Sequence, residues 1–163
     1  MADSTSKNQS SKEPKSISGN IALCAFVEKI HLFKKVAPED MSLVYRAGKY
    51  HKYKSKDIIV KEGEKGEDLF LLVSGNVQVI SRAAGIPVEL GRLSRGAVFG
   101  EVGFLTRKPR TAMIVAVDAV EIISFSRTDL ELVLQKYPKV RKTLQTMMSA
   151  RAEKTIEAIE RSK

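Results

Sequence analysis

The spacing of apolar residues in the first part of the chain predicts helices. Between residues 21 and 33 apolar side chains recur every three or four positions, and Asn20, directly before them, is a favoured helix N-cap. A second helix is predicted around Pro38, which suits an early helical position and is followed by two acids; this helix should run to about Ala47 and stop at Gly48. Residues 21–47 are therefore expected to form N-terminal helices.

From residue 49 to residue 126 the pattern changes to short apolar and β-branched runs separated by turn residues. These runs predict strands over 57–61, 69–73, 77–81, 88–93, 112–117 and 120–125. The glycines between them are better explained by turn geometry than by ligand contact; they are Gly63, Gly66, Gly75, Gly85 and Gly96. Many short strands punctuated by glycine predict a mainly β fold with flanking helices, in the form of an antiparallel β jelly-roll barrel.

Helical spacing returns over residues 127–161. Ser126 or Thr128 can cap a short helix that ends near Lys136, and Pro138 can open a long helix that ends near Arg161. The long helix carries an apolar stripe made of Val140, Leu144, Met147, Met148, Ala152, Ile156 and Ile159. The stripe must pack either on the barrel or on a second copy of itself, so the protein is expected to be either a monomer or a homodimer through this helix.

Residues 1–20 are rich in serine, lysine and asparagine and nearly free of apolar side chains, so we expect a disordered tail followed by one domain over 21–163. The tail lacks the apolar core of a signal peptide, and no apolar run approaches the roughly 20 residues of a membrane helix. A cytoplasmic protein without a membrane segment is expected. The single cysteine, Cys24, excludes an internal disulfide and is expected to be a small buried side chain.

The formal net charge of +9 raises the question of nucleic-acid binding. The dense basic run is Lys49 to Lys56, in which two tyrosines are interleaved with lysines. It could contact phosphates, but a solvated strand edge that lysines protect from aggregation explains it better. A nucleic-acid partner is therefore not expected.

The stretch Phe99–Ala112, FGEVGFLTRKPRTA, contains residues that can bind an anion and residues that can bind the hydroxyl groups of a ligand. Gly100 allows a ligand to approach the backbone closely, and Glu101 offers an acceptor for hydroxyl groups. Arg110 offers a planar pair of donors that suits a phosphate. A sugar phosphate has both kinds of group, and we take this stretch as the candidate binding site.

This stretch resembles the phosphate-binding cassette of the cyclic nucleotide-binding domain family, which includes protein kinase A regulatory subunits, cyclic nucleotide-gated channels and the catabolite activator protein. The Gly-Glu step followed by Pro109-Arg110-Thr111-Ala112 carries the resemblance, and helices before and after a jelly roll agree with it. The resemblance implies cAMP or cGMP as ligand and no other cofactor or metal. Its implied ligand-binding residues are Phe99, Gly100, Glu101, Val102, Gly103, Arg110, Thr111 and Ala112.

The resemblance also implies individual roles. Glu101 would accept a hydrogen bond from the ribose 2′-hydroxyl, Arg110 would pair with the cyclic phosphate, and backbone N–H groups of Val102 and Gly103 would lie near the anion. Thr111 stands where a hydroxyl in related channels favours guanine, although it also accompanies cAMP. Two residues depart from the common pattern: Gly103 replaces alanine, which should loosen its short helix slightly, and Phe70 replaces tyrosine.

Arg151 interrupts the apolar stripe of the long helix and needs an acceptor. The resemblance makes it a possible lid over the base, whereas an ordinary surface cation at the edge of the stripe is the alternative. For Glu101 and Arg110 the alternative is a salt bridge with each other in a domain that binds no ligand.

Four functions remain to be compared. The leading hypothesis is a cyclic-nucleotide sensor without enzymatic activity, which couples ligand binding to movement of the C-terminal helices and signals to an unknown protein effector. A metal-dependent enzyme on a similar barrel needs clustered histidines, and the chain has two, His31 and His51. A DNA-binding regulator would need a further domain after the long helix. The fourth function is that of a ligand-free interaction domain that keeps the fold, or of the sensor fragment of a larger effector.

Overall fold

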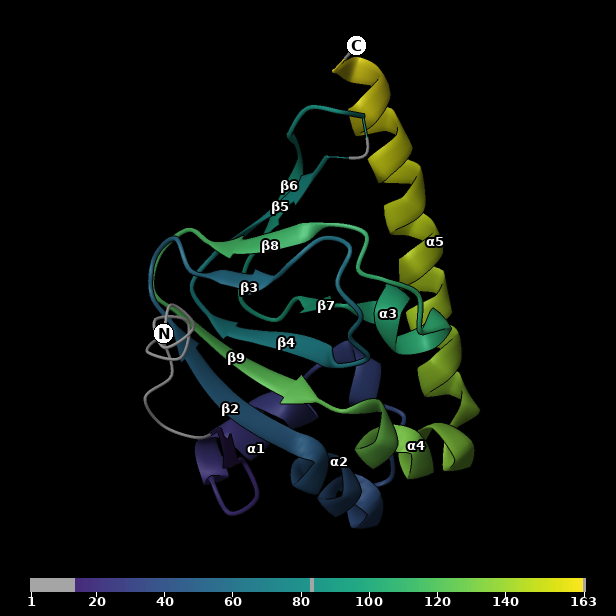
Figure 1. Ribbon diagram of the computed structural model, residues 1–163. Coiled ribbons are helices and arrows are strands. Elements are labelled where there is room, and N and C mark those ends of the chain that lie inside the picture. The colour runs from purple at the N-terminus through teal and green to yellow at the C-terminus, as the bar shows by residue number, and fades with distance from the viewer. Residues whose placement is uncertain (1–13, 83, 163) are drawn as a thin grey trace.

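Two antiparallel sheets face each other and enclose an apolar interior (Figure 1). The computed structural model describes residues 14–82 and 84–162. One sheet has the strand order β1-β2-β9-β4-β7 and consists of β1 (Lys15–Ser16), β2 (Gly48–Tyr53), β4 (Leu69–Ser74), β7 (Val98–Phe99) and β9 (Val120–Phe125). The other has the order β3-β8-β5-β6 and consists of β3 (Ile58–Val60), β5 (Val77–Ser81), β6 (Val88–Leu93) and β8 (Met113–Ala116). The predicted jelly-roll fold with flanking helices is confirmed.

The central strands of the larger sheet are buried on both faces. Leu72 of β4 and Ile122 of β9 point into the interior between the sheets, whereas Leu71 and Ile123 point to the opposite face, where the helices pack. All four side chains are at most 1% exposed. This double burial explains why these strands read as almost continuous apolar runs, and it ties the helices to the barrel.

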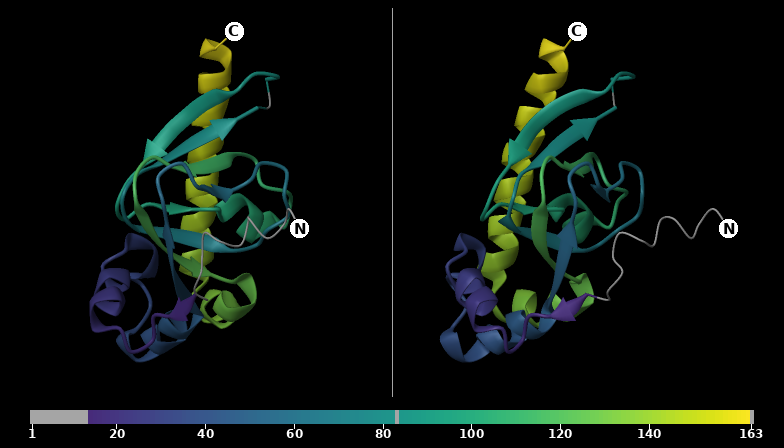
Figure 2. Two further views of the ribbon diagram at one scale, coloured as in Figure 1. Left: turned by 60° about the vertical axis from the view of Figure 1, so that its left-hand side comes forward. Right: turned by 90° about the vertical axis from the view of Figure 1, so that its left-hand side faces the viewer.

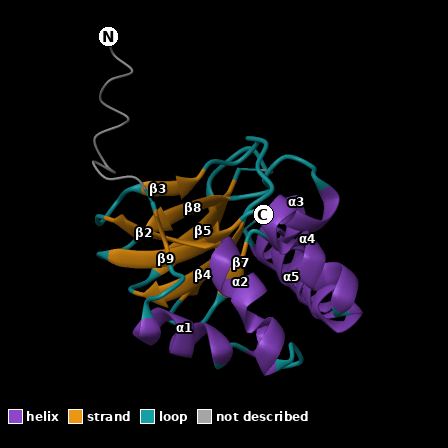
Figure 3. Ribbon diagram, turned by 90° about the horizontal axis from the view of Figure 1, so that it is seen from below, coloured by secondary structure: helices purple, strands orange, loops and turns teal. Residues whose placement is uncertain are grey.

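The N-terminal helical region consists of α1 (Ile21–Glu28), the 3-10 turns η2 (His31–Phe33) and η3 (Pro38–Asp40), and α2 (Met41–Ala47) (Figure 3). Asn20 caps α1 as predicted, because its side chain accepts a hydrogen bond from the Leu23 N–H. The helical pattern from residue 21 to residue 33 does not form one helix. Ile30 has an extended backbone, so the helix ends and a 3-10 turn carries Phe33 into the core.

The predicted tail over residues 1–20 is wrong in its last part. Residues 1–13 lie outside the described residues, but Lys15 and Ser16 pair with β2, and Ile17 is 0% exposed in the core. Ile17 packs against Gly48, where an added Cβ would lie 2.9 Å from Ile17 Cδ1. Strand pairing and the burial of Ile17 together hold this segment against the sheet.

The basic run lies on β2, which pairs along its whole length with β9 and at Lys49 and Tyr50 also with β1. The strand is therefore an edge only beyond Tyr50, and the predicted lysine-protected edge is correct in part.

Of the predicted turn glycines, Gly63, Gly75, Gly85 and Gly96 have the positive φ that such turns require, whereas Gly66 does not.

The C-terminal helices follow the prediction closely. Ser126 caps α4 (Arg127–Lys136), and α5 begins at Pro138 and ends at Arg161. Figures 1 and 2 show α5 rising from α4 along the side of the barrel, past α3 (Glu101–Thr106) and the β5–β6 hairpin. Val140, Leu144 and Ala158 are buried in the domain itself, while Ile156 is 57% exposed. Within the described part of the chain, no helix combines the length and apolarity needed to cross a membrane.

Candidate functional site

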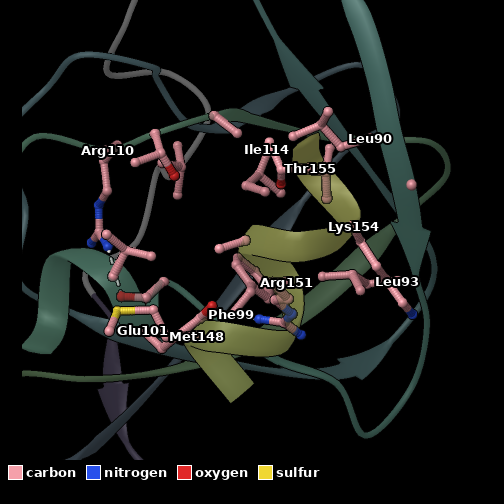
Figure 4. A pocket seen from close by; sticks show the side chains of 18 of the residues that line it. Leu90, Leu93, Phe99, Glu101, Arg110, Ile114, Met148, Arg151, Lys154 and Thr155 are labelled. Atoms are coloured by element: carbon pink, nitrogen blue, oxygen red, sulfur yellow. Dashed lines mark hydrogen bonds and ion pairs between the residues drawn. The ribbon is translucent and has the colours of Figure 1, made fainter. Parts of the chain in front are cut away.

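A cavity of about 690 Å³ lies between the barrel, α3 and α5 (Figure 4). The sequence-predicted site residues all line it: Phe99, Gly100, Glu101, Val102, Gly103, Arg110, Thr111, Ala112 and Arg151. The end of β7 and the stretch that joins it to β8 supply the first eight, and α5 supplies the last, from about forty positions further along the chain. The fold therefore brings the cassette and the predicted lid residue to one site.

The backbone turn at Gly100 directs the cassette into the cavity. Gly100 has φ +86° and precedes α3, and Arg107, the C-cap residue directly after α3, has φ +62°. A Cβ at Gly100 would lie 2.9 Å from the Asp68 carbonyl oxygen and 2.9 Å from Phe70 Cδ2. Glycine is required here for two reasons, because both the left-handed conformation and the close packing exclude a side chain.

Arg110 is buried and held from behind by backbone carbonyl groups. It is 8% exposed; Nη1 donates to the Gly100 oxygen and Nη2 to the Asp68 oxygen, both at 3.0 Å. Its guanidinium also lies over the Phe70 ring, 5.4 Å from the centroid. These contacts fix the orientation of the guanidinium at the wall of the cavity.

Burial lowers the pKa of the Arg110 guanidinium, and the nearby Asp68 and Glu101 carboxylates oppose this. Burial raises the pKa of the Asp68 carboxyl group, and Arg110 opposes that shift in turn. Arginine remains a cation at any ordinary pH. The site therefore presents a fixed positive charge in a partly desolvated wall, where an anion gains more from it than in water.

Glu101, the second predicted contact residue, pairs with α5 rather than with Arg110. Its side chain is 5% exposed, and Oε1 accepts a hydrogen bond from Arg151 Nη1 at 2.7 Å. The alternative in which Arg151 is an ordinary surface cation is wrong, because its guanidinium is tied to the cassette. The salt bridge between Glu101 and Arg110 does not occur among the ion pairs of the described residues.

The part of the cavity away from Arg110 is mainly apolar and is covered by α5. Figure 4 shows Arg110, Glu101 and Met148 on one side, with Leu90, Leu93, Lys154 and Thr155 on the other. Val60, Val79 and Ile114 complete the strand wall. A flat apolar group fits between this wall and α5, with Thr155 and Lys154 able to meet polar atoms at its edge.

Sequence reasoning missed the contribution of Met148 and Thr155, although their spacing from Arg151 contained the signal. Residues three before and four after Arg151 lie on the same face of a helix. It also assigned Gly66 to a turn, whereas Gly66 lies beside the Arg110 guanidinium. The glycine at position 103, which departs from the common alanine, is required by packing, because an alanine Cβ there would lie 2.4 Å from the Gly66 oxygen.

The two histidines do not meet. His31 lies in η2, and His51 in β2 shares a 2.7 Å hydrogen bond with Ser124 Oγ in the wall of the barrel. No group of three or more His, Cys, Asp or Glu side chains suited to a metal ion occurs within residues 14–82 and 84–162. The candidate site is thus a binding cavity with an arginine, a glutamate and an apolar wall.

Comparison with known proteins identifies the family. Residues 50–137 match the family model of the cyclic nucleotide-binding domain, and the chain belongs to this family. It is 31% identical over 114 residues to a cyclic nucleotide-gated potassium channel of Mesorhizobium japonicum, an alignment that covers 70% of this chain and 30% of the channel. It is also 31% identical over 109 residues to a cAMP-dependent protein kinase regulatory subunit of Debaryomyces hansenii, with coverage of 67% and 24%.

Among solved structures, cAMP-bound PfPKA-R superposes with a TM-score of 0.74 at 25% identity, and the match covers 84% of this chain and 46% of that one. The chain spans less than a third of the length of the two curated relatives named above. The resemblance recognised in the cassette is confirmed, and it extends from the motif to the whole fold. The chain is a member of the cyclic nucleotide-binding domain family, which its relatives among channels and kinase regulatory subunits share.

Proposed function

We propose that the cavity binds a purine cyclic nucleotide, cAMP or cGMP, and that the domain acts as a sensor without chemistry of its own. The observation that carries the proposal is the placement of Arg110 and the Glu101–Arg151 pair in one cavity, with an apolar wall beyond them. A cyclic phosphate needs a fixed cation, a ribose hydroxyl needs an acceptor, and a purine needs an apolar slot. In the proposed complex, Arg110, Glu101 and the apolar wall would meet the phosphate, the ribose and the base in that order.

In the proposed complex the cyclic phosphate meets the Arg110 guanidinium and the N–H groups of Val102 and Gly103 in the first turn of α3. The ribose 2′-hydroxyl donates to Glu101, whose second carboxylate oxygen has no hydrogen bond among the described contacts. The base lies between the strand wall and α5, beneath Met148 and Thr155. The structural match to cAMP-bound PfPKA-R supports this placement.

Coupling to the helices would run through Arg127 at the start of α4. Arg127 Nη1 donates to the Phe104 oxygen in α3, and its guanidinium lies over the Phe104 ring at 5.6 Å. A ligand that draws α3 towards the phosphate would pull on this contact and shift α4 and α5 together. Such a switch requires that the ligand bind one helix arrangement more tightly than the other.

A second candidate function is a domain that keeps the fold for protein interaction and binds no nucleotide. It is favoured by the fact that Glu101 already has a partner in Arg151, and Arg110 has partners in two carbonyl groups.

The downstream effector could lie elsewhere in a longer protein or in another chain, because the curated relatives are several times longer.

Thermal unfolding with and without ligand distinguishes the two functions. The sensor predicts that cAMP or cGMP raises the midpoint of unfolding in a concentration-dependent way, because a ligand that binds the folded state stabilises it by mass action. Adenosine and guanosine serve as controls without the phosphate. An unchanged midpoint at millimolar cAMP and cGMP would leave the interaction domain as the better account.

A further inference from the structure

Three glycines surround the Arg110 guanidinium, and each leaves room that a methyl group would fill. An added Cβ would lie 2.9 Å from Arg110 Nε at Gly66, 3.1 Å from Nη1 at Gly100 and 2.8 Å from Nη1 at Gly103. Real Cβ atoms rarely approach a neighbour this closely. The three glycines come from the loop before β4, the turn before α3 and α3 itself.

Gly66 has no conformational reason to be glycine. Its φ is outside the positive range, unlike that of Gly63 in the same loop. The three nearest atoms that its Cβ would meet all belong to the Arg110 side chain, namely Nε at 2.9 Å, Nη2 at 3.0 Å and Cζ at 3.3 Å. The backbone would accept alanine at this position, but the guanidinium would have to move.

Gly103 brings two backbones into direct contact. Its Cβ would lie 2.4 Å from the Gly66 carbonyl oxygen, which is closer than any such contact can be. The loop that contains Gly66 and the helix that contains Gly103 therefore approach each other more closely than an alanine at position 103 would allow. The Arg110 guanidinium lies beside this contact, and both of its Nη atoms donate hydrogen bonds to backbone carbonyl oxygens.

We propose that Gly66 and Gly103 are positioning residues for ligand binding: their missing side chains set the depth and direction of the Arg110 guanidinium in the phosphate end of the cavity. This inference rests on the proposed cyclic-nucleotide function. Gly66 thus has a role in the site, and position 103 is glycine because a larger residue would displace the arginine. Alanine at position 103 favours a helix but weakens binding of the phosphate in this chain.

The test compares Gly66→Ala and Gly103→Ala with wild type by calorimetric titration of cAMP, cGMP and adenosine. We expect each variant to weaken binding of the better cyclic nucleotide about tenfold, the loss of roughly one charge-assisted hydrogen bond, and to leave adenosine binding unchanged. Gly85→Ala is the control, because it adds the same methyl group in a hairpin turn where no atom lies within 4 Å. It should lower stability through its positive φ without changing affinity.

A double-mutant cycle separates positioning from general damage. Combined with Arg110→Lys, which removes the planar guanidinium, Gly66→Ala should cost no further affinity, because the atoms it displaces are gone. Equal losses in both backgrounds, or undiminished cyclic-nucleotide affinity in Gly66→Ala, would overturn the inference.

A ligand-free readout keeps this inference distinct from the proposed function. The Nε–H signal of Arg110 in a ¹H–¹⁵N spectrum, identified by its absence in Arg110→Lys, should shift in Gly66→Ala and stay in place in Gly85→Ala. An unmoved signal refutes the positioning role even if the wild-type protein binds no nucleotide. A moved signal in a protein that binds no nucleotide refutes the proposed function and, with it, the role in ligand binding.

Discussion

Arg151 on α5 donates a hydrogen bond to Glu101 on α3 at 2.7 Å, and this contact joins residues fifty positions apart across the mouth of the cavity. Glu101 is almost fully buried, whereas the Arg151 side chain is 34% exposed. The pair therefore does two things: it gives a buried carboxylate its partner, and it holds α5 over the cavity.

The first prediction concerns this pair. Arg151→Ala leaves the Glu101 carboxylate without its cation, and the free energy of unfolding should fall by about 1 kcal/mol, a value reduced by the partial exposure of Arg151. Amide hydrogen exchange in residues 148–156 should become faster because α5 is less firmly held. Urea unfolding and exchange mass spectrometry measure the two effects, with Lys142→Ala on the exposed side of α5 as the control. A variant with wild-type stability and wild-type exchange would show that the contact does not hold the helix.

The second prediction concerns base preference. Thr111 lines the cavity and is exposed to it, where its hydroxyl can meet a purine bound in the syn form. Thr111→Ala should weaken cGMP binding by about 1 kcal/mol and leave cAMP binding nearly unchanged, because one neutral hydrogen bond is lost. Thr111→Ser should keep the wild-type preference. Equal weakening of both nucleotides would place the Thr111 contribution at the shared phosphate instead.

The third prediction tests the joint between the N-terminal and C-terminal helices. Tyr137, between α4 and α5, donates from its hydroxyl to Asp40 Oδ2 at 2.5 Å and accepts from the Ala37 N–H at 3.2 Å. Tyr137→Phe removes both hydrogen bonds and should lower the free energy of unfolding by about 1–2 kcal/mol. Lys136→Ala, which removes the more exposed partner of Asp40, should cost less. Equal losses in urea unfolding would contradict this ranking.

The fourth prediction concerns pH. Burial lowers the pKa of His51, which shares a hydrogen bond with Ser124 and lies near Asp68 and Lys49, two groups that act in opposite directions. The folded protein binds the His51 proton less readily than the unfolded chain. This contribution to stability is complete above the ordinary histidine pKa of about 6.5 and is lost as the pH falls from there towards the lowered value.

His51→Asn should flatten the pH dependence of stability below about pH 6.5 relative to wild type. His31→Asn, on the 3-10 turn η2, is the matched control. Urea unfolding between pH 5 and pH 8 provides the measurement, and parallel curves for wild type and His51→Asn would exclude a depressed pKa at this residue.

Features with a local cause could be predicted from the sequence. Asn20 and Ser126 bond to backbone N–H groups three residues away, and Pro138 begins a helix because of its own ring. The strands whose bounds are predicted most closely, β5, β6 and β9, each begin with a valine and lie between turn residues. The cassette was recognisable because a motif is also a local pattern.

Features that depend on distant partners could not be predicted. Ile17 is held by Gly48, and β7 is a two-residue strand that exists because Phe99 pairs with Phe70. Arg151 contacts Glu101 only because α5 runs along the barrel past α3. The spacing of apolar residues in α5 shows that Arg151 needs an acceptor, but it does not show which residue the acceptor is.

The central claim is that Arg110 holds the phosphate of a bound cyclic nucleotide. Isothermal titration calorimetry of cAMP and cGMP against wild type and Arg110→Ala tests it most directly. We expect saturable one-site binding of at least one nucleotide to wild type, weakened in Arg110→Ala by about 2–5 kcal/mol, and equal affinity of the two proteins for adenosine. Equal cyclic-nucleotide affinity in the two proteins, or no binding to a folded wild-type protein, would contradict it.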